Sequence, residues 1–217
     1  MAEQEKIKTS KKRILCFGDS NTWGYAPEQL PLPRLSEDSR WTGLLQKKLG
    51  SDWQVLEFGL CGCTSGFENE VHGVNTNART LYPSVLFAQL PVDIVCIMLG
   101  TNDLKTESDW KSGDTAKNLD ALVSVTRGMV PNAKIVLVAP VIFQQGIESN
   151  AALGFDKSAI EKSVLCAQEV ADLAQRLGIL LFDTNAVVHE LCSDGCHFTV
   201  ESHKAFAEAM ADFIAKQ

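Results

Sequence analysis

Short hydrophobic runs alternate along the chain with longer stretches in which hydrophobic residues recur every three or four positions. Runs rich in β-branched and aromatic residues predict five strands, at 13–17, 53–58, 93–99, 134–139 and 179–182. The amphipathic stretches predict helices at 41–49, 78–89, 114–129, 156–177 and 200–216. Most of the strands are apolar on both faces, as expected for a parallel sheet covered by helices on each side. The pattern indicates the α/β class.

Right-handed crossovers between these elements predict a flavodoxin-like, doubly wound five-stranded parallel sheet between helices. Asp114 and Asp156 are the expected N-caps of two helices, and Gly50 and Gly178 the expected stops of two. Functional residues of such a fold collect at the carboxyl ends of the strands. Two long connections, 25–39 and 66–77, are expected to shape a pocket or a subunit contact there.

The 217 residues are enough for one good core, so we expect a polar N-terminal tail at 1–12 and a single domain at 13–217. A net charge of -7 without a large basic block argues against a nucleic-acid partner. We find no apolar stretch of transmembrane length or signal-peptide design. We therefore expect a cytoplasmic protein with no membrane partner.

The seven cysteines are odd in number, and three of them, Cys16, Cys96 and Cys166, lie in apolar sequence typical of a core. The other four are close to the polar segments described next: Cys61, Cys63, Cys192 and Cys196. Together with His197 and His203 they are conceivable metal ligands. Their spacings match no standard zinc pattern, so we favour reduced thiols without a metal.

Four polar segments follow predicted strands: Gly18-Asp19-Ser20-Asn21, Gly59-Leu60-Cys61-Gly62-Cys63-Thr64, Gly100-Thr101-Asn102-Asp103 and Asp194-Gly195-Cys196-His197. A serine hydroxyl needs a neighbouring base to become a good nucleophile, and His197 is the best candidate base for Ser20. Asp194 lies three residues before His197, which places both side chains on one side of a helical turn and lets the carboxylate orient the imidazole. The middle segments offer hydrogen-bond donors for an oxyanion.

Each segment also has an ordinary structural explanation. The first and third are also compatible with capped turns, the glycines of the second with simple turns, and His197 with a surface histidine. Without a functional site, all of these separate explanations must hold independently, and the four segments must still fall in this order at these strand ends. We therefore favour the functional interpretation. The remaining histidines, His72, His189 and His203, have no comparable partner and are interpreted as structural or solvated.

The order and spacing of the four segments resemble the SGNH hydrolases, also called the GDSL esterase and lipase family. The resemblance covers nearly the whole chain after residue 12. Two further segments, Arg40-Trp41-Thr42-Gly43-Leu44 and Leu90-Pro91-Val92-Asp93, resemble the arylesterase and acyltransferase branch. The G-x-S-x-G elbow of α/β-hydrolases is absent from the sequence.

The resemblance implies the SGNH hydrolase fold and a serine esterase that acts on short acyl esters, above all acetyl esters, with acyl transfer to alcohols in some members. It implies Ser20, Asp194 and His197 as catalytic residues. It implies an oxyanion hole formed by the backbone N–H groups of Ser20 and Gly62 and the side-chain amide of Asn102. Such a mechanism requires no metal and no cofactor.

The sequence departs from the family pattern at Asn21, which replaces the Leu of the G-D-S-L form, and at Cys61 and Cys63 beside the oxyanion glycine. These differences leave the acyl and alcohol preferences open. Trp23 and Tyr25 follow the nucleophile and are candidate substrate-binding residues. The alternative for Trp23 is packing in the core beneath the loop.

Several functions stay open besides a simple esterase that acts on a small acyl ester. The first is a carbohydrate O-acetylesterase. A thioesterase or lysophospholipase is a weaker option, because the sequence has no long apolar loop suited to binding a fatty acyl chain. The non-enzymatic alternative is a catalytically silent binding module on the same fold. The long loops are compatible with a homo-oligomer and equally with a monomer, and the natural substrate is not readable from the residues.

Overall fold

The computed structural model describes residues 11–29, 33–149 and 153–217. The predicted polar tail at 1–12 lies outside these residues except for its last two, and the second of them, Lys12, already belongs to the first strand. In the described part of the chain, no helix is both long and apolar enough to cross a membrane.

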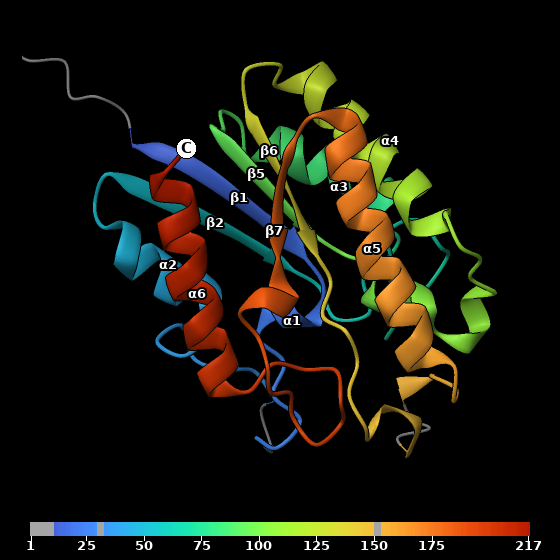
Figure 1. Cartoon of the computed structure of the whole chain (residues 1–217). Coiled ribbons are helices and arrows are strands. Elements are labelled where there is room, and N and C mark those ends of the chain that lie inside the picture. The colour runs from blue at the N-terminus through green and yellow to red at the C-terminus, as the bar shows by residue number, and fades with distance from the viewer. Residues whose placement is uncertain (1–10, 30–32, 150–152) are drawn as a thin grey trace, which may run out of the picture.

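The centre of the fold is a parallel sheet of five strands (Figure 1). Its strand order is β2-β1-β5-β6-β7, which confirms the predicted flavodoxin-like topology. Each strand lies within one residue of its predicted bounds at either end: β1 Lys12–Gly18, β2 Trp53–Gly59, β5 Ile94–Met98, β6 Lys134–Ala139 and β7 Leu180–Asp183.

Helices cover both faces of the sheet (Figure 1). One face packs against α2 (Trp41–Leu49) and α6 (Val200–Ala215). The other packs against α3 (Ala78–Ala88), α4 (Asp114–Met129) and α5 (Ala159–Leu177). The α/β class and the doubly wound arrangement are therefore confirmed.

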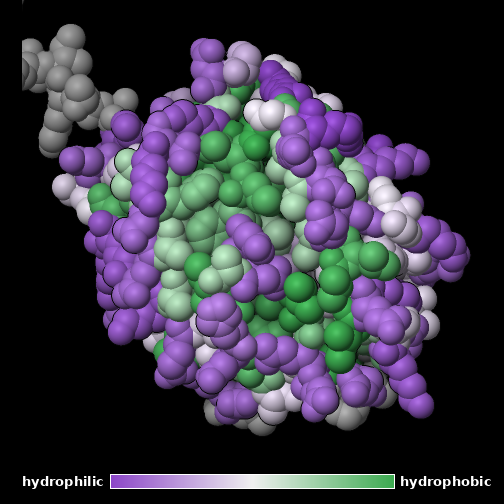
Figure 2. Space-filling model, viewed as in Figure 1, coloured by the Kyte–Doolittle hydropathy of each residue, from purple (hydrophilic) through white to green (hydrophobic). Residues whose placement is uncertain are grey.

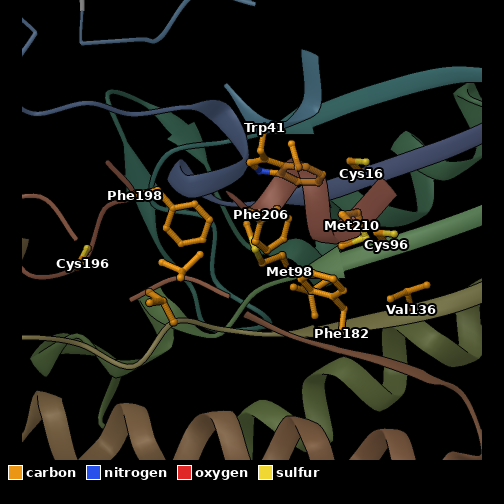
Figure 3. Close-up of a cluster of buried hydrophobic side chains, with 14 of the residues drawn as sticks. Cys16, Trp41, Cys96, Met98, Val136, Phe182, Cys196, Phe198, Phe206 and Met210 are labelled. Atoms are coloured by element: carbon orange, nitrogen blue, oxygen red, sulfur yellow. The ribbon is translucent and has the colours of Figure 1, made fainter. Parts of the chain in front are cut away.

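Alternate side chains of the central strands point to opposite faces of the sheet and supply two cores. Ile14 and Cys16 of β1 point toward α2 and α6, whereas Leu15 and Phe17 point toward α3 and α4. Figure 3 shows the first core, in which Phe206 of α6 lies among the aromatic residues. The three cysteines predicted as core residues, Cys16, Cys96 and Cys166, are all buried.

Two of the four predicted helix signals are wrong. Gly113, in a left-handed conformation, is the N-cap of α4, and Asp114 is its first helical residue. Asp156 precedes α5, where its carboxylate accepts a hydrogen bond from the N–H of Ser158 and leaves the cap position to that serine. The predicted stops, Gly50 and Gly178, do end α2 and α5.

Several short elements were not predicted because they are too short for a hydrophobic period. The helix α1 (Ser20–Trp23) follows β1 directly. The connection 66–77 contains a hairpin of two-residue strands, β3 (Glu70–Val71) and β4 (Val74–Asn75). In the described part of the chain, 3₁₀ helices occupy other connections, at Thr101–Leu104, Thr106–Ser108, Ile147–Ser149 and Thr184–Ala186.

One face of the molecule carries a band of hydrophobic residues between α6 and α5, along the edge strand β7 (Figure 2). Leu180 and Leu181 of β7 are half-buried, and Leu165 on α5 is 51% exposed. Formation of a homo-oligomer, with which the long loops are compatible, stays a prediction.

Candidate active site

The four polar segments meet at the carboxyl end of the sheet, as predicted. Ser20 begins α1 after β1, Gly62 follows β2, Asn102 lies in the 3₁₀ helix after β5, and His197 precedes α6. All four residues line one cavity of about 310 Å³.

A continuous chain of hydrogen bonds joins Asp194, His197 and Ser20. The imidazole Nε2 of His197 lies 2.9 Å from Oγ of Ser20, and Nδ1 lies 2.6 Å from Oδ2 of Asp194. All three residues are buried, each 5% exposed. The Nδ1 contact favours the tautomer in which Nδ1 carries the proton and Nε2 is free to accept the proton of the serine hydroxyl.

The other carboxylate oxygen of Asp194 fixes the loop that carries the histidine. Oδ1 accepts hydrogen bonds from the backbone N–H groups of Cys196 and His197, both at 3.0 Å. Burial raises the pKa of Asp194, but the hydrogen bond and charge of His197 outweigh it, so the net pKa is below its usual range. The predicted helical turn is wrong. The segment is an irregular loop in which Gly195 has a φ of +72°, and the side chains meet through the carboxylate's bonds to the loop.

The histidine loop is anchored on both sides of His197. Phe198, directly after it, is 1% exposed and packs 5.5 Å from Phe206, ring centre to ring centre (Figure 3). The side chain of Asn21, beside the predicted nucleophile, donates to the carbonyl of Cys196 at 3.1 Å and accepts from the N–H of Phe198 at 2.9 Å. Asn21 therefore ties the serine segment to the histidine segment, a role that its sequence neighbours do not reveal.

The serine is held in place by close packing of α1 on the strand ends. A Cβ on Gly59 would lie 2.1 Å from the backbone nitrogen of Trp23, so only glycine lets α1 approach β2 this closely. Asp19 caps α1 by accepting the N–H of Asn21 at 2.9 Å. Burial raises the pKa of Asp19 to about 6.

The second segment forms a tight turn that suits an oxyanion donor. The N–H of Cys63 donates to the carbonyl of Leu60 at 3.0 Å, and Gly62 adopts a φ of +79°, as the third residue of a type II turn must. The β3–β4 hairpin packs over this turn, where Asn69 donates to the carbonyl of Gly62 at 2.8 Å. The N–H groups of Gly62 and Ser20 have no hydrogen-bond acceptor among the described residues.

The amide of Asn102 is oriented by the same turn. Its Nδ2 donates to the carbonyl of Cys63 at 3.1 Å, which leaves its second N–H for another acceptor. The adjacent Asp103 is fully buried and accepts from the N–H of Ser65 at 2.7 Å and the hydroxyl of Thr115 at 2.7 Å. The buried carboxylate thus fixes the Asn102 segment against the Gly62 segment, and its pKa is raised by burial to about 6.

The two predicted substrate-binding aromatics have different positions. Tyr25 lines the cavity, with its ring centre 4.5 Å from that of His197. Trp23 is not among the described residues that line this cavity. Its indole is half-buried and packs instead under the guanidinium of Arg34, 4.8 Å from the ring centre, and beside Tyr25. Its backbone carbonyl also accepts a hydrogen bond from Nε of Arg34 at 2.9 Å.

The cysteines and histidines that were weighed as metal ligands are mostly apart. In the described ranges, one group of three potential ligand residues has its ligand atoms within 4.8 Å of one another: Asp194, Cys196 and His197. His203 lies in the core, where its Nδ1 accepts from the N–H of Trp41 at 3.2 Å. Burial lowers its pKa to about 3, which confirms a structural role. All seven cysteines are free thiols.

Sequence reasoning missed several residues of the cavity wall. His72 was interpreted as structural or solvated, yet with Val71 it lines the cavity from the β3–β4 hairpin. Lys105 follows the Asn102 segment, and Leu153 and Phe155 come from the connection between β6 and α5. The expectation that the connection 66–77 shapes a pocket is confirmed. The other residues carried no signal, because a wall residue needs no particular spacing from the nucleophile.

Comparisons with known proteins agree with this geometry. A family profile described as the GDSL-like lipase/acylhydrolase family matches residues 16–205. The aryl esterase of M. smegmatis is 32% identical with a TM-score of 0.85, and the match covers 94% of this chain and 99% of that one. A carbohydrate acetylesterase from Sinorhizobium meliloti is 30% identical with a TM-score of 0.85, and the match covers 95% of this chain and 99% of that one.

No curated protein sequence matches the chain significantly. The family profile nevertheless spans most of the chain, and the similar structures are esterases of the SGNH type over nearly their full length. The chain therefore belongs to the GDSL-like lipase/acylhydrolase family and is an ester-hydrolysing enzyme with the SGNH hydrolase fold.

Proposed function

We propose that the protein is a serine esterase that cleaves short-chain acyl esters, chiefly acetyl esters, through a covalent acyl-enzyme. One observation carries this proposal. The hydrogen bonds of 2.6 Å and 2.9 Å from Asp194 through His197 to Ser20 end at a cavity that is also lined by Gly62 and Asn102. A nucleophile, its base and an oxyanion site in one cavity are the requirements of acyl transfer.

In the first half of the reaction, Oγ of Ser20 attacks the ester carbonyl while Nε2 of His197 takes its proton. The negative oxygen of the tetrahedral intermediate accepts hydrogen bonds from the N–H groups of Ser20 and Gly62 and from the amide of Asn102. Asp194 stabilises the imidazolium that forms. The ester C–O bond then breaks, and His197 gives its proton to the departing alcohol.

The second half releases the acyl group. A water molecule attacks the acyl carbonyl, His197 takes a proton from it, and the Ser20–acyl bond breaks to give the acid and the restored hydroxyl. An alcohol in place of water gives a new ester by the same steps. The ring of Tyr25 lies beside the imidazole throughout, with its centre 4.5 Å from that of His197.

The size of the cavity supports a small acyl group. Its volume of about 310 Å³ is at the low end of ligand pockets. Val71, Leu153 and Phe155 give it apolar walls. Such a space suits acetyl or propionyl esters better than fatty acyl chains, which disfavours a lysophospholipase or a long-chain thioesterase.

A carbohydrate O-acetylesterase is the second candidate, because a relative of 30% identity carries that name. Both candidates share the same acyl-enzyme and differ in the alcohol. p-Nitrophenyl esters of increasing acyl length, assayed beside acetylated xylose and cellobiose, separate them. We expect the turnover to fall steeply beyond the shortest acyl groups.

The nucleophile is tested directly with Ser20→Ala. We expect folded protein without ester hydrolysis and without labelling by a fluorophosphonate probe, whereas Ser51→Ala, a change at an exposed serine, keeps both. More than a trace of wild-type turnover in purified Ser20→Ala, or a wild-type protein that neither reacts with the probe nor cleaves any ester, contradicts the proposal. The second outcome favours a binding module.

A further inference from the structure

The charges around the cavity are unevenly distributed. None of the described residues that line the cavity is an aspartate or glutamate, and Lys105 is the one lysine or arginine among them. The whole chain has a net charge of -7, so a lone cation in the cavity runs against the general charge of the protein. This contrast marks Lys105 as a candidate specificity residue.

Lys105 is held close to the reacting groups. It is the residue after the 3₁₀ helix Thr101–Leu104, which carries Asn102, so its backbone is fixed with the oxyanion segment. Its aliphatic chain lies beside Gly154, where a Cβ would be 3.8 Å from both Cγ and Cδ of the lysine. The carbonyl of Gly154 in turn accepts the N–H of Thr106 at 2.9 Å. The backbone and stem therefore have defined neighbours.

The ammonium group has no ionic partner. Among the described residues, Nζ of Lys105 makes neither an ion pair nor a hydrogen bond, whereas Lys47, Lys48 and Lys111 each pair with a carboxylate. Lys105 is half-buried, unlike a lysine that extends fully into solvent. A half-buried cation without a counter-ion attracts an anion more strongly than a solvated or paired one does.

We propose that Lys105 selects esters that carry a carboxylate in their acid or alcohol part, with the carboxylate bound by Nζ while Ser20 attacks the ester carbonyl. The inference rests on the proposed esterase function and narrows its substrate class. A carboxylate near an ammonium in a partly solvated cavity gains enough to change kcat/KM by about tenfold. Salt weakens this preference because the cavity is open to solvent.

Two pairs of substrates place the charge on opposite sides of the ester. In the first, 4-acetoxybenzoate is compared with its methyl ester, so that the charge lies on the alcohol part. In the second, mono-p-nitrophenyl succinate is compared with p-nitrophenyl butanoate, so that the charge lies on the acyl part. Each preference is a ratio of kcat/KM values measured on one protein. A general loss of activity in a variant therefore divides out.

The preference is measured in wild type, Lys105→Met, Lys105→Arg and a control, Lys117→Met, which removes the same charge from an exposed site on α4. We expect the ratio to fall about tenfold in Lys105→Met in at least one pair, and to persist in Lys105→Arg and Lys117→Met. The pair that responds shows which side of the ester faces the lysine. Added salt should lower the wild-type ratio toward that of Lys105→Met.

The proposal is overturned if Lys105→Met has the wild-type ratio in both pairs, or if Lys117→Met loses as much as Lys105→Met. Failure of the underlying function looks different. In that case the wild-type protein cleaves neither the neutral nor the charged esters, and Ser20→Ala does not differ from it. Cleavage of neutral esters without a charge preference leaves the esterase standing and removes only the role of Lys105.

Discussion

Replacing Asn21 by leucine tests whether its amide aligns the serine with its base. Leucine has the same branching of its heavy atoms and is somewhat larger, but it has neither donor nor acceptor, so the change removes two hydrogen bonds without opening a cavity. The lost bonds are those to the carbonyl of Cys196 at 3.1 Å and from the N–H of Phe198 at 2.9 Å. Both lie on the peptide groups that flank His197.

The expected magnitude follows from burial. Asn21 is 2% exposed, so the carbonyl and the N–H that it serves lose their partners where water does not easily replace them. Each buried polar group left without a partner costs about 1–3 kcal/mol, or about 2–6 kcal/mol for the two, in the free energy of unfolding. A shift of the imidazole by about 1 Å costs up to about a hundredfold in rate. We therefore expect kcat to fall by about ten- to a hundredfold with little change in KM.

Asn185 provides a matched control. Its side chain bridges two peptide groups in the same way, accepting from the N–H of Ile142 at 2.8 Å and donating to the carbonyl of Pro140 at 3.1 Å. Asn185→Leu should lower stability in urea unfolding while keeping kcat. Asn21→Leu should lower both, and should also slow the reaction of Ser20 with a fluorophosphonate. Wild-type kcat in folded Asn21→Leu, or an equal loss of kcat in Asn185→Leu, would refute the alignment role.

Three further predictions follow from the site. Asn102→Ala should lower kcat by about a hundredfold or more at nearly constant KM, measured on p-nitrophenyl acetate; a change in KM alone would assign it to substrate binding. N-Ethylmaleimide should label Cys61, which lines the cavity, and lower activity, but spare the fully buried Cys63; burial raises the pKa of Cys61 to about 11, so labelling should quicken with pH. The pKa of His203 is about 3 against an ordinary 6.5, so only the unfolded chain binds a proton there between these values. His203 should thus lower the unfolding free energy by about 1.4 kcal/mol per pH unit between about pH 6.5 and pH 3, measured as the difference between wild type and His203→Asn.

The hydrophobic periods were sufficient to predict the main strands and helices, because burial on two faces of a sheet leaves a pattern in every one of them. Elements of two to four residues leave none, which is why α1 and the β3–β4 hairpin were missed. The prediction that Asp114 is a helix N-cap was wrong for a related reason. Cap preference is a local tendency, and Gly113 occupies the cap through a left-handed backbone that the residue types alone do not specify.

The meeting of the four segments was predictable, since parallel strands bring the residues after them to one edge. The cavity wall was not predictable, since Lys105 and His72 enter it through the path of loops whose course depends on tertiary contacts. Trp23 shows the opposite situation. It is close to Ser20 in sequence, but the guanidinium of Arg34 covers its ring, and only Tyr25 reaches the cavity.

The least predictable part of the site is the set of buried polar links between its segments. Asn21 joins segments 175 and 177 residues apart, and Asp103 joins the Asn102 segment to Ser65, 38 residues earlier. A lone asparagine or aspartate in sequence is as compatible with a turn or a cap as with such a link. In the structure these side chains connect the proposed nucleophile to its proposed base, and one proposed oxyanion donor to the turn that carries the other. Because each link is buried, movement of one segment breaks a hydrogen bond that water does not replace, so the reacting groups stay aligned before the substrate arrives.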